Sequence, residues 1–105
     1  MSTSIPLTVV AITRAVAGKE KLLRSAQEKL VAETVKEPDC LRYELSQSLD
    51  DPRVLIFTEK WANEQAWRAH MQGAAIKRFN SSGASQLIEE FSLFRMATVV
   101  DGSWK

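Results

Sequence analysis

Two stretches of the sequence are predicted to be β-strands with apolar side chains on both of their faces. The first, Leu7–Val16 (LTVVAITRAV), is rich in β-branched residues, and its Val9 and Ala11 alternate with Val10 and Ile12. The second is Arg53–Trp61 (RVLIFTEKW), whose apolar residues in chain order are Val54, Leu55, Ile56, Phe57 and Trp61. An antiparallel sheet with one face in water should instead alternate apolar with polar side chains. We therefore expect protein to cover both faces of these strands.

A helix and another strand are predicted between these two stretches. The helix begins at Lys19 and stops near Pro38, and its non-polar or small residues recur at helical spacing as Leu23, Ala26, Leu30, Val31, Thr34 and Val35. Segment Cys40–Ser48 alternates like a half-buried strand, and the turn Asp50–Pro52 is short. We therefore expect this strand to form an antiparallel hairpin with Arg53–Trp61.

The last part of the chain predicts a second helical region and a fourth strand. Asn63 can cap a helix that Gly73 interrupts, and Ala74–Asn80 adds another turn or two. After a break at residues 81–83, Ala84–Glu90 is expected to be a short helical piece, and Phe91–Val100 to be the last strand. The order β-α-β-β-α-β predicts an α+β, ferredoxin-like sandwich with a four-stranded antiparallel sheet and the first and third strands at its centre.

Two helices cover only one face of such a sheet, so the apolar second face needs another cover. A second copy of the same sheet is the economical one, and we expect a homodimer. At 105 residues we expect one domain over 7–100, an N-terminal arm over 1–6 and a C-terminal tail over 101–105, whose Trp104 is a candidate interface anchor.

Composition and charge argue against several classes of function and partner. Fourteen Lys plus Arg against thirteen Asp plus Glu give a net charge of +1, and the basic residues do not cluster, so we expect no nucleic-acid partner. The single cysteine, Cys40, excludes an internal disulfide and fits a reducing compartment, and we interpret it as a small buried residue. No signal peptide or membrane-spanning run is found, so we expect a cytoplasmic protein with no membrane partner.

Few residues remain that could carry chemistry. A single His and a single Cys cannot build a zinc site without carboxylates, so no metal is expected. Trp67 and His70 are three residues apart on a predicted helix and therefore share one side of it, with Phe79 farther along. Aromatic walls beside one imidazole suit a planar aromatic ligand with a hydroxyl group. The alternative is that these aromatic residues and His70 are ordinary core residues, and that Glu59 is an ordinary strand residue.

Three motifs resemble the antibiotic biosynthesis monooxygenase (ABM) family. A strand ends in Glu59-Lys-Trp61, Ala69-His70 follows on a helix, and the second strand of the chain, Cys40–Ser48, is entered through Glu37-Pro-Asp-Cys-Leu-Arg-Tyr43. The resemblance extends from about Leu7 to Val99. It implies a ferredoxin-like dimer whose two sheets meet as a dimeric α/β barrel. Several members of the family are oxygenases that use no metal or organic cofactor, because a deprotonated phenol or hydroquinone can reduce dioxygen directly.

The resemblance also implies roles for individual residues. His70 would hydrogen-bond or deprotonate a substrate hydroxyl as the catalytic residue. Arg42, Tyr43 or Arg95 would stabilise a developing anionic oxygen. The substrate would be a small aromatic molecule and dioxygen the co-substrate, with no cofactor. The expected walls of the substrate pocket are Phe57, Trp61, Trp67, Phe79 and Phe94.

The sequence departs from the family pattern in ways that affect function. Asp39 replaces a Gly before the Cys, but Asp tolerates a left-handed backbone better than most residues. Many relatives carry a second His where this chain has Ala75-Ile-Lys77. Haem-degrading members carry an iron-ligating His near the position of Phe79 and Asn80, so haem degradation is not expected here.

Three functions remain open from the sequence. The first is a cofactor-independent monooxygenase that acts on a hydroquinone or polyphenol. The second is a non-oxidative isomerase or proton-transfer enzyme that acts on a small oxo compound. The third is a small-ligand-binding dimer without turnover.

Overall fold

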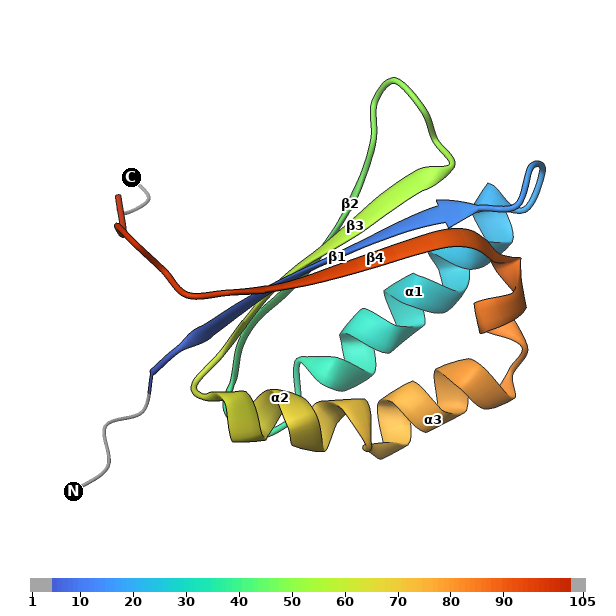
Figure 1. The fold of residues 1–105 in the computed structure, drawn as a ribbon. Helices are drawn as coiled ribbons and strands as arrows, with labels where there is room; N and C mark the ends of the chain where they lie inside the picture. Colours follow the sequence, from blue (N-terminus) through green and yellow to red (C-terminus); the bar gives the residue numbers. More distant parts are fainter. Residues whose placement is uncertain (1–4, 103–105) are drawn as a thin grey trace.

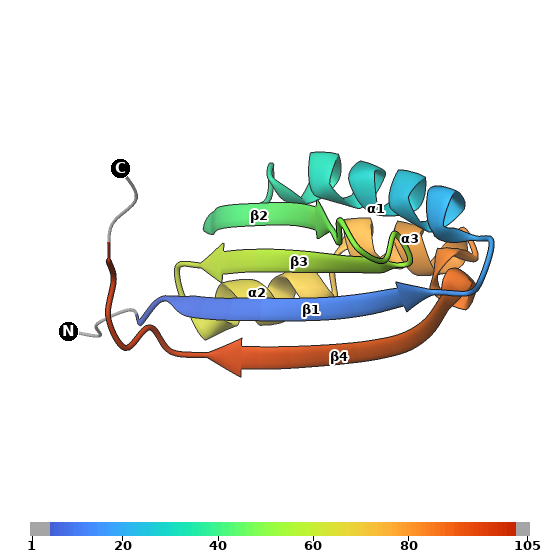
Figure 2. The same cartoon turned by 90° about the horizontal axis from the view of Figure 1, so that it is seen from above.

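The computed structural model describes residues 5–102, in which one antiparallel sheet carries every helix on the same face (Figure 1). The strands lie in the order β2-β3-β1-β4, so β1 and β3 are central, as predicted (Figure 2). The strands are β1 (Leu7–Ala15), β2 (Cys40–Gln47), β3 (Val54–Trp61) and β4 (Ile88–Met96). The helices are α1 (Glu20–Thr34), α2 (Glu64–Met71), α3 (Ala74–Ser81) and a 3₁₀ turn, η1 (Ala84–Leu87). This is the α+β, ferredoxin-like fold that the sequence predicts.

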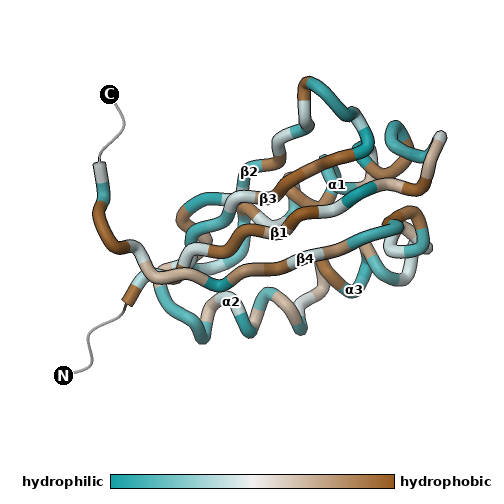
Figure 3. The backbone as a smooth tube through the Cα atoms, turned by 45° about the horizontal axis from the view of Figure 1, so that its top comes forward, coloured by the Kyte–Doolittle hydropathy of each residue, from teal (hydrophilic) through white to brown (hydrophobic). Residues whose placement is uncertain are grey.

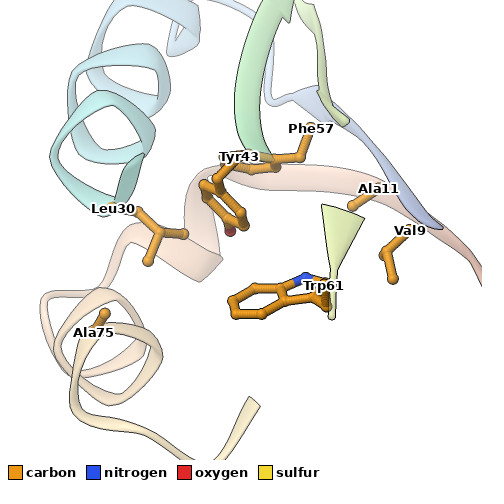
Figure 4. Close-up of a cluster of buried hydrophobic side chains, with 7 residues drawn as sticks. All are labelled: Val9, Ala11, Leu30, Tyr43, Phe57, Trp61 and Ala75. Atoms are coloured by element: carbon orange, nitrogen blue, oxygen red, sulfur yellow. The ribbon is translucent and has the colours of Figure 1, made fainter. Parts of the chain in front are cut away.

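The core lies between the sheet and the helices. Alternate residues of β1 and β3 point toward the helices and are buried, among them Val9, Phe57 and Trp61. Figure 4 shows these side chains, together with Tyr43 of β2, extending from the sheet toward Leu30 on α1. The largest fully buried side chain is that of Trp61. Burial of these side chains fixes the register of the strands, because a slip of one residue would turn each set to the other face.

The turns follow from residues that favour them. Gly18 has a φ of 83° where the chain passes from β1 to α1, and Asp39 has a φ of 62° before β2, so Asp39 adopts a left-handed backbone. The side chain of Asn63 accepts a hydrogen bond from the backbone N–H of Ala66 at 2.8 Å and caps α2, as predicted. Gly73 separates α2 from α3, so the second helical region is two helices.

The fourth strand differs from the prediction of Phe91–Val100. It begins at Ile88 because Ala15, the last residue of β1, pairs with Ile88, and it ends at Met96 because Met96 pairs with Thr8, next to the start of β1. Residues 97–100 have no strand beside them and are not in the sheet. The predicted helical piece Ala84–Glu90 is correspondingly shorter and is the 3₁₀ turn η1.

The buried face of α1 also differs from the prediction. Gln27 is fully buried, whereas Val35 is half exposed and lies just beyond the helix. Gln27 is four residues after Leu23 and therefore shares its face. Burial of this polar side chain is possible because its Nε2 donates to Thr13 Oγ1 at 3.0 Å, and Thr13 Oγ1 donates to the carbonyl of Leu55 at 2.9 Å.

The second face of the sheet carries an apolar strip that no helix of the chain covers (Figure 2). Val10 pairs with Phe94, and Ile12 pairs with Ile56, so these four side chains share the face away from the helices. Figure 3 shows the apolar runs along the central strands β1 and β3. Phe94 is 50% exposed in the single chain. The prediction that β1 and β3 are apolar on both faces is confirmed.

No helix within residues 5–102 is long and apolar enough to cross a bilayer. Trp104, the candidate interface anchor, lies outside the described residues.

Candidate functional site

His70 lines two hollows on the helical side of the sheet. The first, which we call the inner cavity, has a volume of about 380 Å³ and lies between the sheet and helices α1 and α3. Its walls include Tyr43, Phe57, Glu59, His70, Phe79 and Phe91. The second, which we call the outer groove, has a volume of about 490 Å³. Its walls include Glu33, Glu37, Asp39, Ala66, His70 and Arg78.

Glu59 brings a carboxyl group into the wall of the inner cavity. It lies on β3 between Phe57 and Trp61 on the side that faces the helices, and it is only 4% exposed. Burial raises the pKa of Glu59 to about 7, although the Trp61 indole N–H donates to its Oε1 at 2.9 Å and opposes this rise. The negative charge of Glu37 adds to the rise. Glu59 therefore exchanges a proton near neutral pH, as a general base must.

His70 is the last buried residue of α2 and is 2% exposed. Its Nδ1 lies 2.8 Å from Oε1 of Glu37, which is on the loop between α1 and β2. Burial holds the pKa of His70 below its ordinary value, and it outweighs the opposite effect of the hydrogen bond and charge of Glu37. At neutral pH His70 is therefore uncharged, with one nitrogen able to accept a proton.

Aromatic rings surround these two groups. The Tyr43 ring centroid lies 5.1 Å from that of Phe57 and 5.4 Å from that of His70, and the Trp61 centroid lies 4.8 Å from that of His70. Figure 4 shows the rings of Tyr43 and Trp61 on the helical side of the sheet. Burial and the charge of Glu59 both raise the pKa of Tyr43, so its hydroxyl stays protonated and can donate a hydrogen bond.

The structure brings some of the predicted pocket residues together. Tyr43, Phe57, His70 and Phe79 line the inner cavity. Trp61 lies behind the wall, where its ring contacts His70 and its N–H holds Glu59. Trp61 therefore supports the side chains of His70 and Glu59.

The other predicted residues lie elsewhere, which corrects the sequence-based set. Arg42 pairs with Lys60 and Phe94 pairs with Val10, so both point to the sheet face away from the helices. Arg42 lies next to Tyr43 on β2, and since Tyr43 points toward the helices, strand alternation turns Arg42 to the other face.

Trp67 and Arg95 also lie outside the inner cavity and form a separate pair. The guanidinium carbon of Arg95 lies 5.6 Å from the centroid of the Trp67 ring, and Nη1 of Arg95 lies 3.0 Å from Oε1 of Glu64. Arg95 is therefore held beside α2.

Sequence reasoning missed two residues of the site. Glu59 was interpreted as an ordinary strand residue, yet its position alternates with Leu55, Phe57 and Trp61, so a carboxylate on the buried side of β3 could have been predicted. Glu37 lies in a loop, where no periodicity indicates which way a side chain points. Only its place in the family motif drew attention to it.

The arrangement suits a planar aromatic molecule with an ionisable hydroxyl group. Aromatic walls bind the ring, and two proton acceptors, Glu59 and His70, share the same cavity. Within residues 5–102 no group of three or more His, Cys, Asp and Glu side chains is placed to hold a metal ion.

Comparisons with known proteins agree with this fold. The protein PA3566 of Pseudomonas aeruginosa is 27% identical with a TM-score of 0.87, over 95% of this chain and 100% of that one. The protein SO0527 of Shewanella oneidensis is 29% identical with a TM-score of 0.83, over 90% of this chain and 92% of that one. A solved structure described as an antibiotic biosynthesis monooxygenase is 23% identical with a TM-score of 0.82, over 90% of this chain and 99% of that one, which supports the fold alone.

A search of curated proteins found no match. The family model described as antibiotic biosynthesis monooxygenase matches residues 6–82, a stretch that runs from β1 through α3 and contains Glu37, Glu59 and His70. Because this match covers well over half of the sequence, the chain belongs to the antibiotic biosynthesis monooxygenase family.

Proposed function

We propose that the protein is a cofactor-independent monooxygenase that oxidises a small aromatic hydroquinone or polyphenol with dioxygen. The observation that carries the proposal is the buried carboxyl of Glu59, whose pKa is raised to about 7, in one aromatic-walled cavity with His70. Membership of the family supports monooxygenase-like chemistry in general. The substrate class rests on the contents of the inner cavity.

The cavity contents support the first step of such a reaction. Tyr43, Phe57 and Phe79 would hold the ring of the substrate, and its hydroxyl would face Glu59 and His70. Transfer of the hydroxyl proton to one of these groups leaves a phenolate, which is electron-rich enough to react with dioxygen. A protein needs to supply only the binding, the proton acceptor and the exclusion of water.

The proposed reaction balances without any added reductant. A hydroquinone and one dioxygen give a hydroxyquinone and one water. One oxygen atom enters as a ring hydroxyl and the other leaves as water. Oxidation of the hydroquinone to the quinone and hydroxylation of one ring carbon together supply all the electrons. The proton taken up by Glu59 or His70 returns to the reduced oxygen as water forms.

We also propose that the working form is a homodimer. The strip formed by Val10, Ile12, Ile56 and Phe94 is continuous by strand register, and the helices of the chain lie on the other side of the sheet. An apolar face of this kind favours association with a second copy of the same sheet.

Oxygen uptake by the metal-free protein against a panel of hydroquinones and polyphenols tests the proposed activity. Protein-dependent uptake that falls by about 10²-fold or more in Glu59→Gln or in His70→Ala would support it. Glu28→Gln, an exposed residue on α1, removes the same charge outside the cavity and should leave uptake unchanged.

Two other results would replace the proposal with the functions left open by the sequence. No uptake above autoxidation, with conversion of a small oxo compound that depends on His70, would indicate an isomerase. Binding of aromatic compounds without any conversion would indicate a non-catalytic binding protein.

A further inference from the structure

The pair formed by Glu37 and His70 separates the inner cavity from the outer groove. Glu37 lines the outer groove and is not part of the wall of the inner cavity, whereas His70 lines both. The His70 side chain is 1% exposed, and that of Glu37 is 22% exposed. The imidazole therefore has a buried carboxylate neighbour on the inner side, Glu59, and a partly hydrated one on the outer side, Glu37.

The chemistry of this pair decides which nitrogen of His70 carries the proton. A carboxylate only accepts hydrogen bonds, so the Nδ1 that lies 2.8 Å from Glu37 Oε1 must carry a hydrogen and donate it. In the neutral ring, Nε2 is then unprotonated. It has no hydrogen-bond partner within residues 5–102. Since Nδ1 is engaged at the outer groove, Nε2 is the nitrogen that remains for a ligand in the inner cavity.

We propose that Glu37 is a positioning residue that holds His70 in the Nδ1–H tautomer, so that Nε2 accepts the substrate hydroxyl proton in the inner cavity. This inference rests on the proposed function. When Nε2 takes up the proton, the imidazolium is stabilised by the Glu37 carboxylate at 2.8 Å. In this step the O–H bond of the substrate breaks and an Nε2–H bond of His70 forms, and no other bond changes. The proton stays on Nε2 until dioxygen is reduced.

The charged and titratable groups around His70 are consistent with this role. On the inner side lie Tyr43, which stays protonated, and Glu59, which exchanges a proton near neutral pH. On the outer side, Arg78 of α3 forms an ion pair with Glu33 of α1. The charged and titratable groups that line the two hollows together with His70 are Glu33, Glu37, Asp39 and Arg78 at the outer groove, and Tyr43, Glu59, Glu89 and Glu90 at the inner cavity.

Nitrogen NMR of the labelled protein tests the inference without any substrate, because His70 is the only histidine of the chain. In the wild-type protein at pH 8, we expect the spectrum of a neutral imidazole protonated at Nδ1. In Glu37→Leu, which cannot accept a hydrogen bond, we expect a shift toward the Nε2–H form. We also expect a lower pKa for His70, since the carboxylate that raises it is gone.

Glu33→Leu is the matched control. Glu33 lines the same groove, is similarly exposed at 26%, and makes its contact with Arg78 instead of His70. We expect this variant to keep both the tautomer and the pKa of the wild-type His70. A wild-type spectrum of the Nε2–H form would overturn the inference and needs no variant. Equal tautomer populations in wild type and Glu37→Leu would also overturn it.

Kinetics separate this inference from the proposed function. If a substrate is found, Glu37→Leu should lower kcat by about 10- to 100-fold, with a much smaller change in KM, and Glu33→Leu should change neither. An unchanged kcat in Glu37→Leu would overturn the inference while the proposed function stands. If no substrate is turned over, the proposed function fails, and the tautomer result alone decides whether Glu37 positions His70.

Discussion

At the scale of single residues, the site depends on two carboxylates with different surroundings. Glu59 is buried beside an indole N–H, and Glu37 is partly hydrated beside an imidazole. Environment rather than residue type separates their tasks, since burial raises the pKa of Glu59 to about 7 and makes it a proton acceptor near neutrality. Glu37, on the proposal above, positions His70.

Replacement of Glu59 by Gln should change how stability depends on pH. The pKa of Glu59 rises from 4.5 to about 7 on folding, so its contribution is fully present below pH 4.5 and is lost as the pH rises through 7. Between pH 4.5 and 8 the wild type should therefore lose about 3 kcal/mol that Glu59→Gln does not lose. Urea unfolding at a series of pH values measures this difference.

His70 contributes to the same curves with the opposite sign. Its pKa is lowered on folding, so its stabilising contribution is lost as the pH falls below 6.5. Both proteins keep His70, and this contribution largely cancels in their difference. Parallel stability curves for wild type and Glu59→Gln would show that the Glu59 carboxyl titrates normally and would contradict the account of the site.

At the scale of elements, α2 carries His70 at the end opposite to its cap. Asn63 accepts the N–H of Ala66 at 2.8 Å and satisfies one of the free donors of the first turn. The helix has only 8 residues, so its position depends on this cap and on packing against β3.

Asn63→Ala should destabilise the protein by about 1 kcal/mol, because the first turn of α2 loses its side-chain acceptor. Thermal and urea unfolding would measure the loss, and Asn63→Asp, whose carboxylate can accept the same bond, should retain most of the stability. If Asn63→Ala and Asn63→Asp unfold alike, the cap does not stabilise α2.

The helices and strands also show which parts of the fold local sequence patterns can predict. Alternation and turn residues were enough to predict β1, β2, β3 and α1 within a residue or a few, because each pattern reports local burial. The start of β4 at Ile88 depends on its pairing with Ala15, which is a contact far along the chain. For the same reason the burial of Gln27 could not be predicted, since its partner, Thr13, is on another element.

The candidate site, like the fold, could be predicted from the sequence only in part. His70 and the inward rings of Tyr43 and Phe57 were identified, because helix spacing and strand alternation place them. Arg42 was included although alternation with the inward Tyr43 places it on the other face of the sheet, and Glu37 could not be placed because it lies in a loop.

At the scale of the whole molecule, the uncovered apolar strip predicts a dimer. Light scattering at micromolar concentration should give twice the chain mass of 11.8 kDa. Ile56→Lys places a charge at the centre of the strip, on the face away from the helices, and should shift the protein toward the monomer while it stays folded. A wild-type monomer at these concentrations would contradict the predicted dimer.

The proposed function requires that an aromatic substrate bound in the inner cavity is oxygenated by dioxygen. The most direct measurement is the mass of the product that metal-free protein forms from a hydroquinone under ¹⁸O-labelled dioxygen, with Glu59→Gln beside it. The account predicts one labelled oxygen atom in the hydroxyquinone, the other in water, and a large loss of product in Glu59→Gln. An unlabelled product, or equal amounts of labelled product from the wild type and from Glu59→Gln, would contradict it.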